Sequence, residues 1–456
     1  MIAFQLSEAA DLMQGRLLGD DARFDAVGTD TRTLGAGDLF VAIRGPHFDG
    51  HDFLSVAARQ GATGALVERD VDSLLPLIRV EDSLRGLGEL AAAWRDRAQA
   101  FVIGITGSNG KTTLKEMCAA ILEQGHRVLA TRGNLNNDIG MPLTLTRLQD
   151  EQFAVIEMGA NHAGEIRYLS NIARPDVAVL NNAGRAHLEG FGSLEGVARA
   201  KAEIIEGLKE DGVFVFNADD RFAALWRQLA AGREQLGFGV QRPADVSSPQ
   251  DSYRIDWDAQ GFIASFEVNA GAQHFEVSMP LAGEHNRMNA LAAIASCQVA
   301  GIDTLQMRAG LASLKPVAGR LAPLAGCGGA RLIDDSYNAN PDSVIAALKV
   351  LRVAPGRRTL VLGDLGELGP EQQALHAELG RRASEAGIDR LLSCGSLSHA
   401  ASESFEGESQ HFESQEALIE QIGGQLSADD SVLIKGSRAS AMDRVVTALS
   451  AGGRAC

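Results

Sequence analysis

The residues best suited to chemistry lie in the segment FVIGITGSNGKTT, residues 101–113. An apolar run leads into a glycine-rich turn, which Lys111, Thr112 and Thr113 follow. This order is typical of a phosphate-binding loop, because backbone N–H groups of a tight glycine turn and of a helix N-terminus point at phosphate oxygens. The lysine adds a positive charge, and a threonine hydroxyl can hold Mg²⁺. The segment therefore predicts that the chain binds a nucleoside triphosphate.

One residue departs from the usual pattern of such a loop, since Ile105 stands where a glycine is expected. The flanking residues support the prediction. Residues 100–106 form a short apolar run, as expected of a buried parallel strand, and residues 114–122 carry apolar side chains at helical spacing. The alternative is a glycine turn that only joins a strand to a helix, but such a turn has no need of Lys-Thr-Thr.

The size and charge of the chain narrow its possible functions. A chain of 456 residues is too long for one ordinary core, so we expect about three domains. A formal net charge of −17 argues against nucleic-acid partners and anionic membrane surfaces, because both would repel the protein. No apolar stretch reaches the length of a membrane span, and no signal peptide is evident. We expect a cytoplasmic protein without membrane insertion.

The cysteines give an indication of the redox compartment. They are Cys118, Cys297, Cys327, Cys394 and Cys456. They lie far apart and form no CxxC pair. An odd, scattered set is typical of reduced and mostly buried thiols in a cytosol, so we expect all five to be thiols.

The first 82 residues predict a small α/β domain. Short strand-like runs lie at residues 38–43, 64–67 and 77–80. A helical stretch at residues 83–97 leads from this segment to the phosphate loop.

Residues 83–313 predict a parallel sheet with helices on both faces, because strand runs alternate with helical ones. After the phosphate loop, the strand runs lie at residues 153–157, 177–181 and 212–217. Residues 253–279 change to period-two alternation around Gln260-Gly261, which predicts a small antiparallel hairpin. A helix near residues 289–299 closes the segment.

From residue 314 to residue 456 the alternation of strand and helix restarts. The strand runs lie at residues 331–335, 359–363, 390–394 and 431–435. This pattern predicts a smaller, Rossmann-like domain. The predicted fold class is therefore α/β, with three domains at residues 1–82, 83–313 and 314–456.

Two further side chains are expected near the phosphates, because ligands of open parallel sheets gather beyond the carboxyl ends of the strands. Glu157 closes one predicted strand, and His187 lies in the glycine-rich loop after another. Thr112, Glu157 and a phosphate offer the oxygen ligands that Mg²⁺ prefers. Taken alone, a loop histidine is more often structural, and Glu157 could equally be a solvated strand end.

Lys201 has an unusual position on a predicted helix at residues 193–208. The apolar stripe of this helix consists of Leu194, Val197, Ala198, Ile204, Ile205 and Leu208. Lys201 lies in the middle of the stripe, where a charge is costly unless it is paired or chemically altered. The pattern alone favours a side chain that reaches past the helix edge to solvent. The alternative is a neutral amine in the active site that takes up CO₂ and becomes a carbamate, an oxygen ligand for a metal.

Several short motifs follow one another along most of the chain. They are TGSNGKTT (106–113), EMG (157–159), GRAHLEGFG (184–192), RAKAEI (199–204), GEHNRMNALAA (283–293), AGR (318–320), DDSYNANPDS (334–343) and KGSR (435–438). This set resembles the Mur ligases of peptidoglycan synthesis, which are ATP-dependent amide-bond-forming enzymes with three domains.

Two motifs indicate which member of the family the chain resembles. DDSYNANPDS and the segment DTRTLGAGDLFVAIRGPHFDGHDF (30–53) are similar to the member that joins D-alanyl-D-alanine to UDP-N-acetylmuramoyl-tripeptide. The motif DNPR, expected of the member that adds the third peptide residue, is absent. By resemblance the third residue of the tripeptide is meso-diaminopimelate, and we expect the enzyme to be a monomer.

The resemblance implies an ATP site. Its phosphate-binding residues would be Gly107, Ser108, Asn109, Gly110, Lys111, Thr112 and Thr113. Asn286 and Asn289 would contact adenine, whereas Arg320 and Asp335 would contact phosphate and ribose as the domains close. The alternatives are that Asn289 only begins a helix and that Asp335 is a turn residue before Asn340-Pro341. Lys435 either faces the same cleft or is an ordinary surface lysine.

The resemblance also implies the catalytic and metal-binding residues. Lys111, His187 and Lys201 would be catalytic. Thr112 and Glu157 would hold one Mg²⁺, while His187 and a carbamylated Lys201 would help to hold a second.

The peptide substrate would extend across two domains. In the N-terminal, UDP-binding domain its contacts would be Asp30, Thr31 and Arg32, with the loop at residues 45–51. In the central domain its contacts would be Asn134, Asn136 and Asn137. Polar loops of this kind are often only turns.

The implied reaction activates a carboxylate with ATP, giving an acyl phosphate that the amine of D-alanyl-D-alanine attacks. Another amino-acid-adding Mur ligase and a folylpolyglutamate synthase-like ligase are rival interpretations, although the latter needs no N-terminal UDP-binding domain. A nucleotide-dependent switch that makes no bond is a third, and it would hydrolyse or hold ATP without needing an amine.

Overall fold

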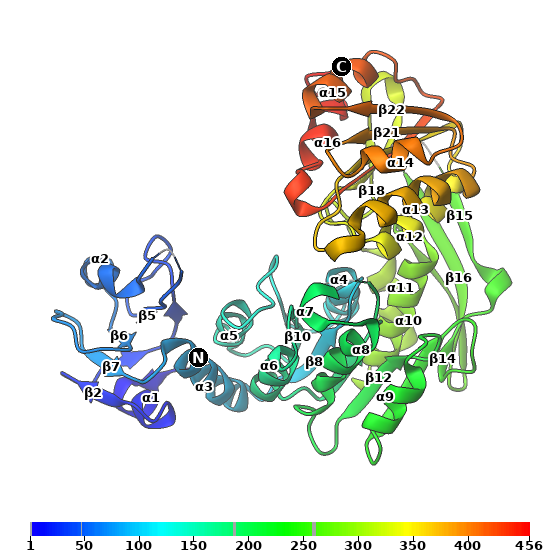
Figure 1. The fold of residues 1–456 in the computed structure, drawn as a ribbon. Helices are drawn as coiled ribbons and strands as arrows, with labels where there is room; N and C mark the ends of the chain where they lie inside the picture. Colours follow the sequence, from blue (N-terminus) through cyan, green and yellow to red (C-terminus); the bar gives the residue numbers. More distant parts are fainter. Residues whose placement is uncertain (1, 47, 186–187, 258–260) are drawn as a thin grey trace.

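Three main sheets, one from each part of the chain, organise the molecule (Figure 1). The computed structural model describes residues 2–46, 48–185, 188–257 and 261–456. Strands alternate with helices in each part, which confirms the predicted α/β class. Within the described residues, no helix combines the length and the apolar character that a membrane span requires.

The N-terminal sheet has the strand order β2-β7-β6-β5-β4. Its strands are β2 (Arg16–Leu18), β4 (Val27–Gly28), β5 (Leu39–Val41), β6 (Gly64–Val67) and β7 (Leu77–Arg79). The pair β2 and β7 is antiparallel, and the other pairs are parallel. Three of these strands, β5, β6 and β7, coincide with the predicted runs. The helices are α1 (Leu6–Leu12) and α2 (Leu54–Gln60), and β1 (Phe4–Gln5) pairs separately with β3 (Arg23–Phe24).

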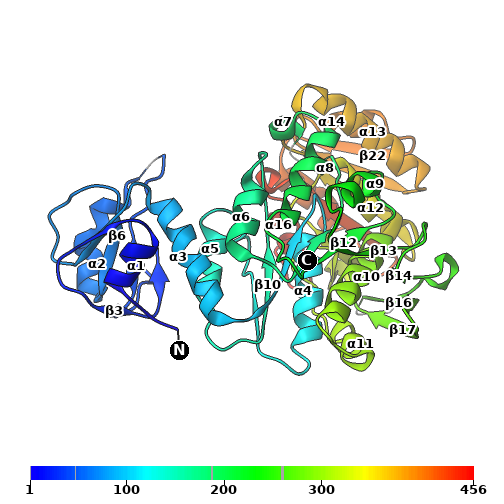
Figure 2. The same ribbon diagram turned by 90° about the horizontal axis from the view of Figure 1, so that it is seen from below.

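Helix α3 (Ser83–Ala98) connects the N-terminal part to the central part (Figure 2). It begins where the side chain of Asp82 accepts hydrogen bonds from the N–H groups of the next turn. Trp94 on this helix is fully buried, in the same hydrophobic core as Phe4 and Phe24 from the N-terminal part and Leu145 from the central part. Its indole N–H donates to the carbonyl of Leu148 at 2.7 Å. The two parts are therefore joined by a continuous core rather than by a bare linker.

The central sheet contains the phosphate loop. Its parallel strands are β8 (Phe101–Thr106), β9 (Val128–Ala130), β10 (Phe153–Glu157), β11 (Val177–Leu180), β12 (Val213–Asn217), β13 (Glu234–Gly239) and β14 (Val246–Ser247). They lie in the order β14-β13-β12-β11-β8-β10-β9. Every residue of β10 and β11 is buried, as expected of parallel strands covered on both faces. Strand β8 lies between β10 and β11, so the segments that follow these three strands meet at one edge.

The predicted antiparallel hairpin extends this same sheet. Strand β15 (Arg254–Trp257) pairs with β16 (Phe262–Ala270), which pairs with β17 (Gln273–Met279) and with β14. Gln260, at the predicted turn, lies outside the described residues. The hairpin is thus an edge of the central sheet, because β16 continues the ladder of β14.

The helices of the central part are α4 (Lys111–Leu122), α5 (Gly140–Leu145), α6 (Glu165–Ala173), α7 (Leu188–Phe191), α8 (Leu194–Ala202), α9 (Ala223–Leu229), α10 (Glu284–Val299) and α11 (Thr304–Ala312). Two predictions are corrected. The helix expected at residues 193–208 ends as α8 at Ala202, and a 3₁₀ turn, Glu203–Ile205, follows. The helix expected near residues 289–299 begins earlier, at Glu284, because Gly283 with φ 105° provides its N-cap.

The C-terminal sheet has the order β18-β19-β23-β20-β21-β22. Its strands are β18 (Ala322–Ala325), β19 (Arg331–Asp335), β20 (Arg357–Gly363), β21 (Arg390–Cys394), β22 (Glu408–Phe412) and β23 (Asp430–Lys435), and its helices are α12 (Pro341–Arg352), α13 (Gln372–Glu385), α14 (His399–Glu403), α15 (Gln415–Gly423) and α16 (Asp443–Leu449). Only the edge pair β18 and β19 is antiparallel among its described pairs. The edge strand β22 was not predicted, because its sequence ESQHF is mostly exposed and carries no apolar alternation.

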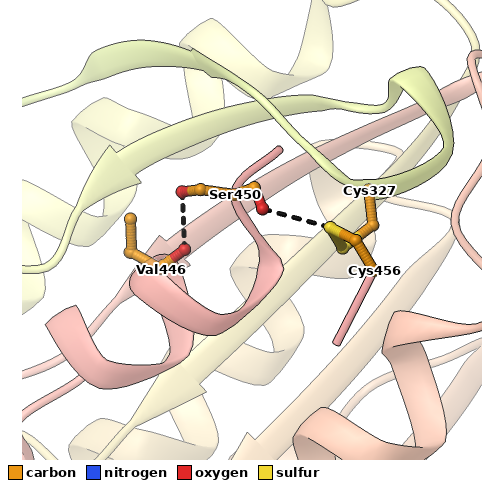
Figure 3. Close-up of a disulfide and its surroundings, with 4 residues drawn as sticks. All are labelled: Cys327, Val446, Ser450 and Cys456. Atoms are coloured by element: carbon orange, nitrogen blue, oxygen red, sulfur yellow. Dashed lines mark hydrogen bonds between the residues drawn. A yellow bond between two sulfur atoms is a disulfide. The ribbon is translucent and has the colours of Figure 1, made fainter. Parts of the chain in front are cut away.

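The expectation of five reduced thiols is wrong for two of the cysteines. Cys327 and Cys456 form a disulfide with Cα atoms 4.9 Å apart (Figure 3). The C-terminal tail folds back on the sheet, where the N–H of Ala451 donates to the carbonyl of Ala325 at 2.8 Å. This tertiary contact brings together cysteines 129 positions apart, which spacing alone does not reveal. The other three cysteines are buried thiols, as predicted.

Candidate active site

A cleft of about 490 Å³ lies between the carboxyl edge of the central sheet and the C-terminal domain. Its lining includes most of the residues predicted for the nucleotide and for its Mg²⁺: Ser108, Asn109, Gly110, Lys111, Thr112, Thr113, Glu157, Asn286, Asn289, Arg320 and Asp335. These residues come from five separate parts of the sequence. The strand order accounts for this convergence, because the phosphate loop follows β8, Glu157 ends β10 and Asn181 follows β11.

The phosphate loop requires a glycine at position 110. Gly110 has φ 78°, a left-handed conformation that favours glycine. A Cβ atom at this position would lie 2.5 Å from Oδ1 of Asn289, so the loop and helix α10 approach too closely for any side chain. Helix α4 begins at the next residue. Its first N–H groups, which have no partner within a helix, therefore point toward the cleft.

The ammonium of Lys111 lies over the loop and donates a 2.8 Å hydrogen bond to the carbonyl of Gly107. Burial lowers the pKa of this lysine, and the nearby charge of Glu157 opposes that shift. Arg320 is close enough to lower the pKa of Lys111 further. Two cationic side chains from different domains thus face the same part of the cleft, an arrangement that favours a polyanionic ligand.

Thr112 and Glu157 come together as predicted for a magnesium site. The hydroxyl of Thr112 donates to Oε2 of Glu157 at 2.9 Å, and Nδ2 of Asn136 donates to Oε1 at 2.7 Å. Glu157 is 2% exposed, so the alternative of a solvated strand end is wrong. The oxygen donors fit Mg²⁺, which usually takes one or two protein ligands together with waters and phosphate. No group of three His, Cys, Asp or Glu side chains that could hold a metal occurs in the described part of the chain.

Lys201 is buried on helix α8, with 2% of its surface exposed. Its ammonium donates to the carbonyl of Ala160 at 3.3 Å, so the side chain does not reach solvent and that interpretation is corrected. Burial, with a further contribution from Lys111, lowers the pKa of Lys201 to about 7. Near neutral pH a large share of this amine is therefore uncharged. His187 lies outside the described residues.

The two asparagines of helix α10 form a chain of hydrogen bonds with the loop after β11. Asn181 donates to Asn289 at 2.7 Å, and Asn289 donates to Asn286 at 3.2 Å. Both helix asparagines are 3% exposed. Asn289 lies within the helix, so the alternative that it begins the helix is wrong. The contacts hold the amide groups in fixed orientations at the cleft.

His285, in the same motif, is a cleft residue that the sequence analysis missed. Burial lowers the pKa of its imidazole to about 4, so the ring is neutral at pH 7. The charges of Asp335 and Lys435 act on it in opposite directions. The motif GEHNRMNALAA is noted above for its asparagines, and the histidine directly before Asn286 is the signal that could have identified this residue.

The C-terminal domain contributes a second group of side chains. The guanidinium of Arg320 lies 4.4 Å from the ring centroid of Tyr337. Asp335, the last residue of β19, forms a 2.6 Å ion pair with Lys435, the last residue of β23. Lys435 is 2% exposed, so it is a buried partner of Asp335 and not a surface lysine. Both residues line the cleft.

The predicted substrate residues separate into two groups. Asn134 and Asn136 line the cleft, whereas Asn137 lines a second cavity of about 780 Å³ between helices α3 and α6. Asp30 and Arg32 form an exposed 2.6 Å ion pair in the N-terminal domain, outside the lining of either cavity. A hydrogen bond from Arg32 lowers the pKa of Asp30 to about 2. Thr31 lies between them in the sequence.

Several polar residues of the cleft were not predicted. They are Asn181, Asn182, Asn217, Tyr337, Asn338, Asn340 and Asp342. The first two directly follow β11, and Asn217 ends β12, so the strand-end argument that selected Glu157 applies to them equally. The others lie in DDSYNANPDS, in which the sequence analysis gives a ligand-binding role only to Asp335.

Three consecutive regions of the chain match models of known families. The model of the Mur ligase family catalytic domain matches residues 23–95, that of the Mur ligase middle domain residues 105–297, and that of the Mur ligase glutamate ligase domain residues 319–438. These matches follow the order of the three sheets.

Individual relatives are similar over nearly the full length. The chain is 45% identical to UDP-N-acetylmuramoyl-tripeptide--D-alanyl-D-alanine ligase of Escherichia coli (strain K12), with 99% of this chain and 100% of the relative covered. A crystal structure of MurF from Acinetobacter baumannii is 36% identical with a TM-score of 0.90 and 98% of each chain covered. MurF from Thermotoga maritima in complex with ADP is 31% identical with a TM-score of 0.83, covering 92% of this chain and 96% of that one. The chain therefore belongs to the Mur ligase family.

Proposed function

We propose that this ligase uses ATP to join D-alanyl-D-alanine to UDP-N-acetylmuramoyl-tripeptide through an acyl phosphate, in the synthesis of peptidoglycan precursors. The observation that carries the proposal is the cleft where Lys111, Thr112 and Glu157 face Arg320 and Asp335 across two domains. The E. coli relative, whose printed name states this reaction, is 45% identical over nearly the whole chain and supports the choice of substrates.

ATP would bind with its phosphates on the loop from Gly107 to Thr113. The N-terminus of helix α4 and the ammonium of Lys111 offset the phosphate charge. Asn286 and Asn289 would contact the adenine, since their amide groups can both donate and accept hydrogen bonds. Arg320 would contact a phosphate and Asp335 the ribose. The ADP complex of the similar T. maritima protein supports a nucleotide at this family's active site.

Thr112 and Glu157 would hold one Mg²⁺, and His187 with a carbamate on Lys201 would help to hold a second. Such ions neutralise charge on the phosphates and on an incoming carboxylate. A lysine reacts with CO₂ through its neutral amine, and the lowered pKa of Lys201 supplies that form near neutral pH. The burial of Lys201 supports the carbamate further, because a lone buried ammonium is unfavourable.

The peptide substrate would extend from the N-terminal domain to the cleft. Asp30, Thr31 and Arg32 would contact the UDP end, and Asn134, Asn136 and Asn137 the part that reaches the central sheet. We propose domain boundaries at residues 1–82, 83–313 and 314–456. The first is supported by the start of helix α3 at Ser83 and the second by the new sheet that begins with β18.

In the first chemical step, a carboxylate oxygen of the tripeptide attacks the γ-phosphorus of ATP and the bond to the β-phosphate oxygen breaks, releasing ADP. In the second, the amine of D-alanyl-D-alanine attacks the acyl carbon, loses a proton and displaces inorganic phosphate. Lys111 of the central domain and Arg320 of the C-terminal domain would together stabilise negative charge on the transferred phosphoryl group. The enclosing domains exclude the water that would hydrolyse the acyl phosphate.

We place this reaction in the cytoplasm, where ATP is supplied, and propose that a monomer performs it, since one chain provides every cleft residue described above. The third residue of the tripeptide would be meso-diaminopimelate.

The experiment that tests the function measures phosphate release with each substrate alone and with both. The proposed ligase releases phosphate in a sustained manner only when the UDP-tripeptide and D-alanyl-D-alanine are both present. A nucleotide-dependent switch would instead hydrolyse ATP without an amine. A panel of UDP-muramoyl peptides, each tested with single amino acids and with dipeptides, distinguishes this ligase from the other amino-acid-adding Mur ligases. The proposed enzyme should use the UDP-tripeptide with the dipeptide.

Lys111→Ala provides the matched inactive variant. It should lose ligation while retaining its circular dichroism spectrum, because the lysine contacts the loop carbonyl and not the core. Lys315→Ala, at an exposed lysine, is the control. Substantial activity in Lys111→Ala would contradict the assignment of the phosphate loop.

A further inference from the structure

Arg185 connects the loop after β11 to two helices of the C-terminal domain. Its backbone N–H and its Nε both donate to the carboxylate of Asp342 at 2.9 Å. Its Nη1 donates to Oε2 of Glu378 at 3.3 Å. Asp342 lies in the first turn of α12, and Glu378 lies on α13. One side chain of the central domain is thus paired with two carboxylates across the domain boundary.

The backbone contact makes this more than a pair of flexible side chains. Since main chain and side chain of Arg185 bind the same carboxylate, the loop itself is fixed relative to α12. The exposed fraction is 29% for the Arg185 side chain, 37% for Asp342 and 26% for Glu378. Partial burial of this kind reduces solvent screening of the ion pairs.

The same loop is hydrogen-bonded to the phosphate loop. The N–H of Gly184 donates to the hydroxyl of Ser108 at 2.9 Å. From the other side, Asn340, the N-cap of α12, donates through Nδ2 to Oδ1 of Asn109 at 2.7 Å. The start of α12 therefore contacts the phosphate loop directly through Asn340 and indirectly through Asp342, Arg185 and Gly184.

We propose that Arg185 is a positioning residue that latches the C-terminal domain onto the phosphate loop and so sets the apparent affinity for ATP. The kinetic part of this inference rests on the proposed ligase function. Arg320 and Asp335 lie on the C-terminal domain, so the nucleotide site is complete only when that domain is docked. When a binding-competent state is only partly populated, the apparent dissociation constant rises in inverse proportion to its population.

The test uses charge reversal at Arg185 in the full-length protein. Arg185→Glu places a carboxylate against Asp342 and Glu378, so the docked state should become less populated. We expect the KM for ATP to rise about tenfold, with kcat at saturating ATP within about twofold of wild type, because no catalytic group is removed. Small-angle scattering should show a larger radius of gyration for the nucleotide-free variant. Arg185→Lys keeps the positive charge but loses the planar guanidinium that contacts both carboxylates. Its KM for ATP and its radius of gyration should therefore lie between those of the wild type and Arg185→Glu.

The chain offers a matched control in Arg358 and Asp389, which lie within the C-terminal domain. There too the backbone N–H and Nε of the arginine donate to one carboxylate, at 2.8 and 2.9 Å, and the side chains are 27% and 40% exposed. Arg358→Glu thus removes an equivalent pair that crosses no domain boundary. It should leave the KM for ATP and the radius of gyration unchanged.

Four outcomes decide the proposal. A raised KM with an expanded shape in Arg185→Glu alone supports it, and so does recovery of both values in the swapped double variant Arg185→Glu with Asp342→Arg. Unchanged KM and scattering would overturn it, as would equal effects in the Arg358 control. Should Arg185→Glu fail to fold, Arg185→Lys and Arg185→Met carry the same comparison. Small-angle scattering does not depend on enzymatic activity. It therefore tests whether Arg185 docks the C-terminal domain even if the ligase assay shows no activity.

Discussion

The hydroxyl of Thr112 and the carboxylate of Glu157 lie 2.9 Å apart, although 45 positions separate them in the chain. Strand β8, which precedes the phosphate loop, pairs with β10, and Glu157 is aligned with Ile105 in that pair. The register of these two parallel strands therefore brings Thr112 and Glu157, the proposed Mg²⁺ ligands, close together.

This relationship predicts the effect of Glu157→Gln. The substitution keeps the size of the side chain and an acceptor for Asn136 but removes the negative charge that favours Mg²⁺. We expect ligase activity to fall about a hundredfold and the Mg²⁺ concentration for half-maximal activity to rise. Mg²⁺ titrations of ADP release measure both. Glu234→Gln, at an exposed glutamate of β13, is the control, and wild-type Mg²⁺ dependence in Glu157→Gln would disprove the site.

The buried amine of Lys201 predicts a dependence on CO₂. Protein stripped of CO₂ at slightly acidic pH should lose activity, and added bicarbonate should restore it. With ¹³C-labelled bicarbonate, NMR should show a carbamate signal that Lys201→Met lacks. Absence of both the rescue and the signal would show that Lys201 acts as an unmodified lysine.

His285 predicts a specific loss of stability in acid. Its pKa is lowered from 6.5 to about 4 in the folded protein. Between these values the unfolded chain binds more protons than the folded one, so the stabilisation is complete above pH 6.5 and is lost as the pH falls toward 4. Each pH unit in this window corresponds to at most about 1.4 kcal/mol.

The matched variant for this effect is His285→Asn. Urea unfolding at pH 7 and at pH 4.5 measures the free energy of unfolding of the wild type and of the variant. The difference between wild type and variant should shift against the wild type as the pH falls, by at most about 3 kcal/mol. Parallel pH profiles for the two proteins would show that the imidazole is not held neutral.

The disulfide between Cys327 and Cys456 predicts that the stability of the purified, oxidised protein depends on reductant. Opening the bond should lower the free energy of unfolding of the C-terminal domain by about 2–4 kcal/mol. A thiol count in denaturant should give three thiols for the oxidised protein and five after reduction. Cys456→Ser should unfold identically in both buffers. A count of five in the untreated protein would contradict the disulfide.

Sequence reasoning predicted most residues of the cleft because the cleft follows a general rule of parallel sheets, in which ligand sites lie beyond the carboxyl ends of the strands. Two of the contributing segments, the phosphate loop and the loop after β11, follow a buried strand, and Glu157 ends one. The apolar runs that form these strands can be recognised in the sequence. The same reasoning identified Lys201 as unusual from its phase on an apolar stripe. It could not decide between burial and exposure of the amine, because the outcome depends on what covers α8.

The features that the sequence analysis did not predict depend on contacts between distant segments of the chain. Nothing near Gly110 in sequence indicates that Asn289 lies against it, and nothing near Cys327 indicates the return of the C-terminal tail. Nothing in the sequence near Arg185 indicates that Asp342 and Glu378 lie beside it. Such contacts depend on how domains and termini pack, which local patterns do not encode.

An isotope experiment shows whether a carboxylate of the substrate receives the γ-phosphoryl group of ATP, as the proposed reaction requires. UDP-N-acetylmuramoyl-tripeptide with ¹⁸O at both oxygens of its reactive carboxylate is incubated with ATP, Mg²⁺ and D-alanyl-D-alanine, and the released phosphate is analysed by mass spectrometry. An acyl phosphate places one ¹⁸O atom in each phosphate released, whereas Lys111→Ala releases none. Phosphate free of ¹⁸O, accompanied by full formation of the amide, would contradict the mechanism.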